Sequence, residues 1–128
     1  MRRKIFLGSF LVFGGLAAAT PLRAAENTEP LQPTFSSIKS GIIDKRCAIC
    51  HQSGGEASQL PFLEYKDVVD PQGRIVIPGN PDESGLILYT SLPDSNRNRM
   101  PPPSTGPRLK PDEIAVMRTW ISQGALEN

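Results

Sequence analysis

Side chains that bind metals or form covalent bonds are scarce in this sequence, which has one histidine and two cysteines in 128 residues. A single histidine excludes bis-histidine ligation of a metal within one chain. Aromatic residues are also few, with one Trp, two Tyr and five Phe, whereas proline occurs 13 times. The length suits one small domain and excludes a multidomain enzyme. Because core-forming residues are so few, we expect a disulfide, a metal or a large cofactor inside the domain.

The one long apolar run lies at the N-terminus. Residues 5–19 are apolar or small, follow three basic residues, and precede a small residue suited to cleavage, Ala24. The run is shorter than the ~20 residues that a transmembrane helix needs. This pattern predicts a secretory signal peptide over residues 1–24, a periplasmic or otherwise exported protein, and no membrane span once the signal is removed.

Neither positive nor negative charge is in large excess. The whole chain has a formal net charge of +1, and residues 1–24 contain four basic residues and no acidic one, so 10 basic residues remain against 13 acidic ones. A slightly acidic protein offers no basic surface for nucleic acid and no polybasic membrane anchor. Ala25 follows the predicted cut, which excludes a lipid-anchored cysteine at that point.

Both cysteines lie in one short motif, Cys47-Ala48-Ile49-Cys50, and the only histidine, His51, follows at once. C-x-x-C-H is the attachment signature of haem c. Thiols three positions apart lie on one turn of the chain and can add to the two vinyl groups of a haem, while the next imidazole reaches the iron. We therefore predict one haem c, attached through Cys47 and Cys50, with His51 as an axial ligand.

Other uses of the two cysteines fit less well. A structural zinc site needs four ligands, and the chain offers only three Cys and His side chains, all within five residues. A thioredoxin-type dithiol follows a strand in a βαβ unit, and no strand pattern precedes Cys47. A disulfide between Cys47 and Cys50 in a haem-free binding module is the alternative that stays open.

A second axial ligand has to be a methionine, because no other histidine exists. Met1 leaves with the signal peptide, so the candidates are Met100 and Met117. Met117 shares helical spacing with Ile114 and Ile121 and is expected to pack in the core. Met100 lies in a polar loop and is followed by three prolines, which stiffen the chain and hold the thioether in place. Met100 is therefore the predicted sixth ligand of the iron.

Local patterns predict several short helices joined by long loops. Residues 25–33 are polar and contain prolines, and we expect a flexible leader there, before a domain over residues 34–126. Thr34 is the predicted N-cap of a first helix. Gly41 in this helix suggests close approach by the last helix, near Trp120. The other predicted elements are helices over 62–69, 80–92 and 111–124, and an extended segment over 73–78.

These segments together resemble a monohaem class I cytochrome c, and the C-terminal half is similar to small c-type domains of exported bacterial proteins, including those of planctomycetes. The resemblance implies a small all-α cytochrome c fold, with three to five short helices and long loops around one covalently attached haem. It also implies thioethers at Cys47 and Cys50, axial His51 and Met100, and first and last helices that cross. The matching segments are residues 47–51, 77–84, 99–102 and 109–125.

Two positions depart from the pattern of the family. Ile43 stands four residues before the first cysteine, where many members carry an aromatic residue. Residues 60–63 read Leu-Pro-Phe-Leu in place of the common Gly-Pro-Leu. Carried over, the resemblance makes the Pro61 carbonyl the acceptor for the ring N–H of His51, a bond that would orient the imidazole.

An iron with histidine and methionine ligands has no open position for a substrate, and methionine ligation raises the reduction potential. We therefore expect an electron-transfer protein rather than an enzyme. It would carry one electron between redox partner proteins such as a dehydrogenase, an oxidase or another cytochrome. The alternative is a haem-based sensor, or a small-molecule-binding haem subunit, with a displaceable sixth ligand.

Overall fold

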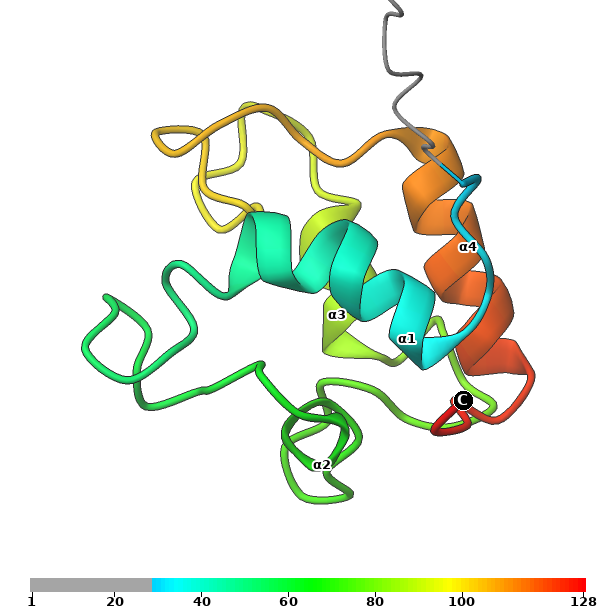
Figure 1. The fold of residues 1–128 in the computed structure, drawn as a ribbon. Coiled ribbons are helices and arrows are strands. Elements are labelled where there is room, and N and C mark those ends of the chain that lie inside the picture. Colours follow the sequence, from blue (N-terminus) through cyan, green and yellow to red (C-terminus); the bar gives the residue numbers. More distant parts are fainter. Residues whose placement is uncertain (1–28) are drawn as a thin grey trace, which may run out of the picture.

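The computed structural model describes residues 29–128, so the predicted signal peptide and the start of the predicted leader lie outside the described residues. Within this part the chain forms helices and loops, without a strand (Figure 1). The all-α class of short helices and long loops is thus confirmed. The elements are α1 (Phe35–Ile38), η1 (Lys39–Cys47), α2 (Tyr65–Val68), α3 (Gly85–Thr90) and α4 (Pro111–Ser122).

The first two elements form one continuous helix, because α1 runs directly into η1 (Figure 1). Thr34 caps it as predicted, with its side-chain oxygen accepting a hydrogen bond from the Ser37 backbone N–H at 3.3 Å. The helix widens toward its end, where the Ala48 N–H donates to the Ile43 carbonyl, five residues earlier, at 2.9 Å. The helix therefore begins at a capped polar residue and ends at the first cysteine.

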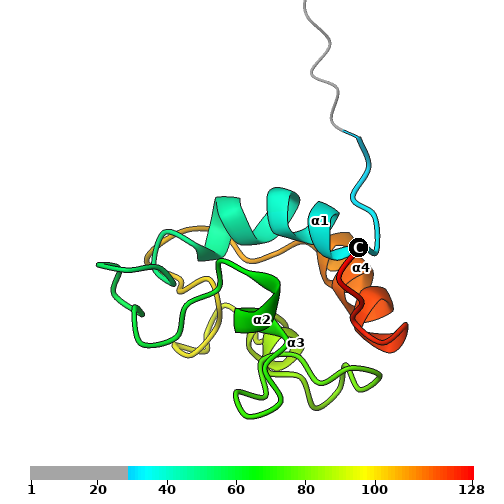
Figure 2. The ribbon, with the colours of Figure 1, turned by 60° about the horizontal axis from the view of Figure 1, so that its bottom comes forward.

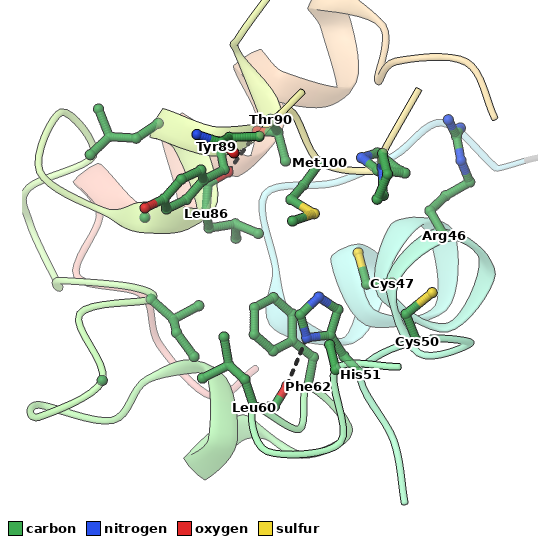
Figure 3. A pocket seen from close by; sticks show the side chains of 18 of the residues that line it. Arg46, Cys47, Cys50, His51, Leu60, Phe62, Leu86, Tyr89, Thr90 and Met100 are labelled. Carbon is green, nitrogen blue, oxygen red and sulfur yellow. Dashed lines mark hydrogen bonds between the residues drawn. The ribbon is translucent and has the colours of Figure 1, made fainter. Parts of the chain in front are cut away.

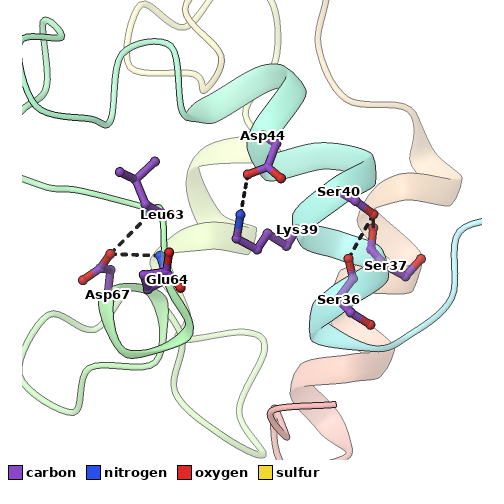
Figure 4. A network of polar contacts seen from close by, with 8 residues as sticks. All are labelled: Ser36, Ser37, Lys39, Ser40, Asp44, Leu63, Glu64 and Asp67. Atoms are coloured by element: carbon purple, nitrogen blue, oxygen red, sulfur yellow. Dashed lines mark hydrogen bonds and ion pairs between the residues drawn. The ribbon is translucent and has the colours of Figure 1, made fainter.

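Figure 4 shows polar contacts along this helix and at the start of α2. Lys39 pairs with Asp44 at 2.8 Å. At the N-terminus of α2, the Asp67 carboxylate accepts hydrogen bonds from the backbone N–H groups of Leu63 (3.3 Å) and Glu64 (3.0 Å). These bonds satisfy N–H groups that a helix start leaves without partners, so even a helix of one turn is held in place.

The last helix, α4, matches its prediction closely. Pro111 opens it, and the Glu113 carboxylate accepts a hydrogen bond from the Lys110 backbone N–H at 2.7 Å. Gly124 follows its end with a φ of +101°, a conformation that favours glycine. Met117 is fully buried in α4, as its helical spacing predicted.

The first and last helices cross, but not at the predicted residue. The ring of Phe35 lies 5.9 Å from that of Trp120 between centroids, which places the crossing at the start of α1. A side chain on Gly41 would instead meet Leu31, whose Cδ1 lies 2.6 Å from the position of an added Cβ. The prediction that Gly41 lies near Trp120 is therefore wrong. Gly41 stands six residues beyond Phe35, about 9 Å along the axis at ~1.5 Å per residue, and so has passed the crossing.

Leu31 also belongs to the leader that the sequence predicts to be flexible, and it packs against the core. The other chain end closes over the same helix. The Asn128 carbonyl accepts a hydrogen bond from the Ser36 N–H at 2.9 Å, and the Asn128 side chain accepts one from the Phe35 N–H at 3.0 Å. Both ends of the described chain are thus attached to α1. The domain boundary at residue 34 stays a prediction.

The middle of the chain places α2 and α3 on one side of the first helix (Figure 2). Helix α3 begins at Gly85, later than predicted, because Asn80 caps a separate turn through a 3.3 Å hydrogen bond from the Glu83 N–H. The buried Ser84 links this turn to the start of α3, since its hydroxyl donates to the Asn80 carbonyl at 2.8 Å. The segment over 73–78 forms no strand and bends at Arg74, where φ is +53°.

The core lies between the first helix, α3 and α4, and includes Ile42 and Ile43 of η1, which precede the cysteine motif. Among residues 29–128, no helix combines the length and the hydropathy that a membrane crossing requires. The largest fully buried side chains include Ile38, Ile42, Ile43, Ile87, Leu109, Met117, Trp120 and Ile121.

Candidate functional site

A cavity of about 960 Å³ opens beside the end of η1 (Figure 3). Its volume lies at the upper end of the ~300–1,000 Å³ that ligand sites span, so it has room for a large cofactor. The cavity unites segments far apart in the sequence: the cysteine motif, the loop after it, helix α3 and the loop that follows α3. The apolar side chains among its lining include Leu60, Phe62, Ile75, Leu86 and Leu88.

The cysteine motif forms a single turn at the edge of this cavity. The Cys47 carbonyl accepts hydrogen bonds from the N–H groups of both Cys50 (3.1 Å) and His51 (3.0 Å). Both thiols are free, and both residues line the cavity with His51 (Figure 3). The structure thus brings the three residues together on one turn, as their spacing predicted.

The two thiols have different surroundings. Burial raises the pKa of Cys47 to about 11, although the nearby Arg46 charge opposes this shift. At neutral pH Cys47 is therefore a protonated thiol.

The imidazole of His51 is held on two sides. Its Nδ1 lies 2.7 Å from the Leu60 carbonyl oxygen, and its ring stacks on Phe62 with centroids 4.3 Å apart. With the Nδ1 proton donated to Leu60, Nε2 keeps its lone pair for a metal. In Figure 3 this second nitrogen points into the cavity, toward the side on which Met100 lies.

The carbonyl that accepts this bond belongs to Leu60 and not to Pro61, so the expectation carried over from the resemblance is wrong. The Phe62 N–H donates to the His51 backbone carbonyl at 3.0 Å, which turns the chain back toward the imidazole. This register brings the carbonyl of Leu60 to the ring nitrogen. A leucine carbonyl supplies the same acceptor, because only the backbone oxygen takes part.

Met100 reaches the cavity from the opposite side (Figure 3). Its backbone N–H donates to the Tyr89 carbonyl at 3.0 Å, which ties the loop to α3. Its side chain is 37% exposed, whereas Met117 is 0% exposed and does not line the cavity. Of the two candidate methionines, the structure therefore places only Met100 opposite His51.

Several lining residues were not predicted as part of the site. Leu60 and Phe62 follow the histidine by nine and eleven residues, and their apolar character within a loop is the signal that could have pointed to them. Tyr89 and Arg46 also line the cavity. Arg46 connects the cysteine turn to the chain before α4, since its guanidinium donates to the Pro107 carbonyl at 2.5 Å.

The donor set fits a haem c. Two free thiols on one turn, an imidazole with an available Nε2, and a thioether across the same apolar cavity are the groups that hold this cofactor. The residues that would hold it are Cys47, Cys50, His51 and Met100.

Comparison with known proteins agrees with this donor set. Residues 47–104 match the family model described as planctomycete cytochrome C, a range that begins at the first cysteine and includes Met100. Neither the curated proteins nor the solved structures contain a match to the chain. Residues 47–104 are therefore similar to the cytochrome c domains of planctomycetes.

Proposed function

We propose that this protein carries single electrons on one haem c, attached through Cys47 and Cys50, with His51 and Met100 as axial ligands. One observation carries the proposal: an imidazole with its Nδ1 bonded to Leu60 and a methionine thioether face each other across one cavity. When bound, the haem supplies an iron that cycles between the ferric and ferrous states. The protein supplies the two ligands and the shielding.

Each residue has a distinct task in this proposal. The Leu60 carbonyl fixes the orientation and the tautomer of His51, and Phe62 supports the ring from one face. The Met100 sulfur closes the opposite side, which leaves no position for a substrate and favours the reduced state. The Met100 N–H bond to Tyr89 lets α3 help to hold that sulfur in place.

The family relationship supports the coarse function. A cytochrome c-type domain implies haem c and haem-based electron transfer, and such domains are generally exported electron carriers rather than enzymes. We extend this to the whole chain: residues 1–24 direct export, and the mature protein exchanges electrons with other redox proteins. An iron with both axial positions filled would exchange electrons with a partner and would not bind a substrate.

The test compares two methionines on the same haem-loaded protein. Met100→Ala should abolish the methionine-to-ferric-iron charge-transfer band, lower the reduction potential and open the iron to cyanide or carbon monoxide. Met117→Leu is the matched control, because the swap nearly conserves volume in the core and should cost less than ~1.5 kcal/mol with an unchanged spectrum. Absorbance spectra and redox titration of the two variants measure both effects.

Three outcomes would overturn the proposal. If Met100→Ala keeps the wild-type spectrum and potential, Met100 is not the ligand. If the wild-type protein lacks the methionine band and binds carbon monoxide rapidly, the iron is open and a sensor or small-molecule-binding haem subunit is the better description. Protein matured in the periplasm without haem absorbance bands would instead indicate a haem-free binding module.

A further inference from the structure

The connection between α3 and α4 runs over residues 91–110 without a helix, and it carries Met100 near its middle. Connections of this length in compact domains are uncommon and are usually functional. The Met100 N–H bond to Tyr89 holds the loop at the methionine, and the Arg46 bond to the Pro107 carbonyl holds it again seven residues later. A sulfur that has to stay on an iron atom needs further restraint, because a flexible loop of this length loses much conformational entropy when its middle is fixed.

Arg99, the residue before Met100, is the most deeply buried charged residue in the described chain, at 2% exposed. Its Nη2 donates to the Gly106 carbonyl at 3.2 Å, and its Nε lies 3.2 Å from the Asp94 carboxylate. The contact with Asp94 is an ion pair without hydrogen-bond alignment. Within residues 29–128, Nε and Nη1 are buried without a hydrogen-bond acceptor. A guanidinium in such surroundings is costly, so its presence calls for a reason.

The contacts of Arg99 span the methionine symmetrically. Asp94 precedes Met100 by six residues and Gly106 follows it by six, so the arginine side chain joins the two halves of the loop behind the sulfur. The neighbouring Asn98 and Met100 line the cavity, whereas Arg99 does not. Its shielded nitrogens therefore do not face the cavity, and we expect any effect on the iron to pass through the loop.

We propose that Arg99 is a positioning residue that clamps residues 94–106 and thereby holds the Met100 sulfur against the haem iron. This inference rests on the proposed function, because it takes Met100 as the ligand. A charged clamp is suited to the task, since a guanidinium donates in several directions from one rigid plane and can hold two chain segments at once. A lysine ends in a single ammonium group and cannot reproduce the contacts with both Asp94 and Gly106.

The experiment uses the full-length, haem-loaded protein and the variants Arg99→Met and Arg99→Lys. Arg108→Met is the matched control, because it removes the same charge from an exposed side chain in the same connection. Imidazole binding to the ferric protein is measured by absorbance, and loss of the methionine band on heating is compared with loss of helix by circular dichroism.

For Arg99→Met we expect imidazole to bind about tenfold more tightly than to the wild type, which corresponds to loss of one hydrogen bond to a charged group. The methionine band should disappear on heating before the helices do. Arg99→Lys should lie between this variant and the wild type, and Arg108→Met should match the wild type. A purely structural role would move the band and the helix signal together, and that result would overturn the proposal.

Asp94→Asn keeps the test decisive if Arg99→Met does not fold, since Asp94 is largely exposed. Tighter imidazole binding in this variant supports the clamp, and an affinity within about twofold of the wild type counts against it.

Met100→Ala separates the two proposals. If it retains the methionine band, the proposed function fails; if it loses the band while Arg99→Met behaves as the wild type, only the clamp is wrong.

Discussion

Replacing Gly55 with alanine should destabilise the cysteine turn more than the same substitution at any other glycine near it. A Cβ at this position would overlap the Cys50 carbonyl oxygen and lie 2.8 Å from its carbonyl carbon and 3.1 Å from its Cα. These are backbone atoms, and the same carbonyl accepts a 3.0 Å hydrogen bond from the Ala57 N–H. The overlap can therefore be relieved only by a backbone shift, and we expect that shift to disturb Cys50.

Overpacking of this kind costs ~1 to 3 kcal/mol, and the backbone contact puts Gly55→Ala near ~3 kcal/mol. In a domain of this size that corresponds to a fall in melting temperature of roughly 12 to 24 °C. Gly41→Ala is the matched control, because its added Cβ meets only the end of the flexible Leu31 side chain. The gain in helix propensity, up to ~1 kcal/mol, offsets that contact.

The assay is thermal unfolding of the ferric protein by circular dichroism, with haem content per chain measured by absorbance. Gly55→Ala should melt earlier and mature with less haem, while Gly41→Ala should stay close to the wild type. Equal melting temperatures for the two variants would show that the loop after His51 yields without moving Cys50, and the reasoning from the contact would be refuted.

Two further predictions concern the cofactor itself. If both thiols form thioethers, the denatured chain should keep its haem colour after extraction with acidic organic solvent, and release of free haem into the organic layer would contradict the assignment of Cys47 and Cys50. Replacing both cysteines with serine should leave a largely unfolded protein, because the cavity of about 960 Å³ then has no cofactor to complete the core. A cooperative thermal transition like that of the wild type would show that folding does not depend on the haem.

Local sequence signals determined the elements whose partners are close in the chain. Thr34 caps the first helix, and Pro111 and Gly124 bound the last one, because a cap or a special backbone angle depends on neighbouring residues. The shared turn of Cys47 and His51 follows from their spacing alone. Asn80 is the local signal that misled, since the same residues can cap an isolated turn as readily as a helix.

Only the tertiary structure decided which residues surround these elements. That Leu60 and not Pro61 accepts the His51 bond, that Gly41 faces Leu31, and that Arg99 bridges a loop all depend on how distant segments meet. Spacing along the chain restricts neighbours within a turn, but a loop can bring any of several carbonyls or side chains to one point. Packing of the whole domain selects among them, which is why the proposed ligands could be predicted from the sequence and the residues that orient them could not.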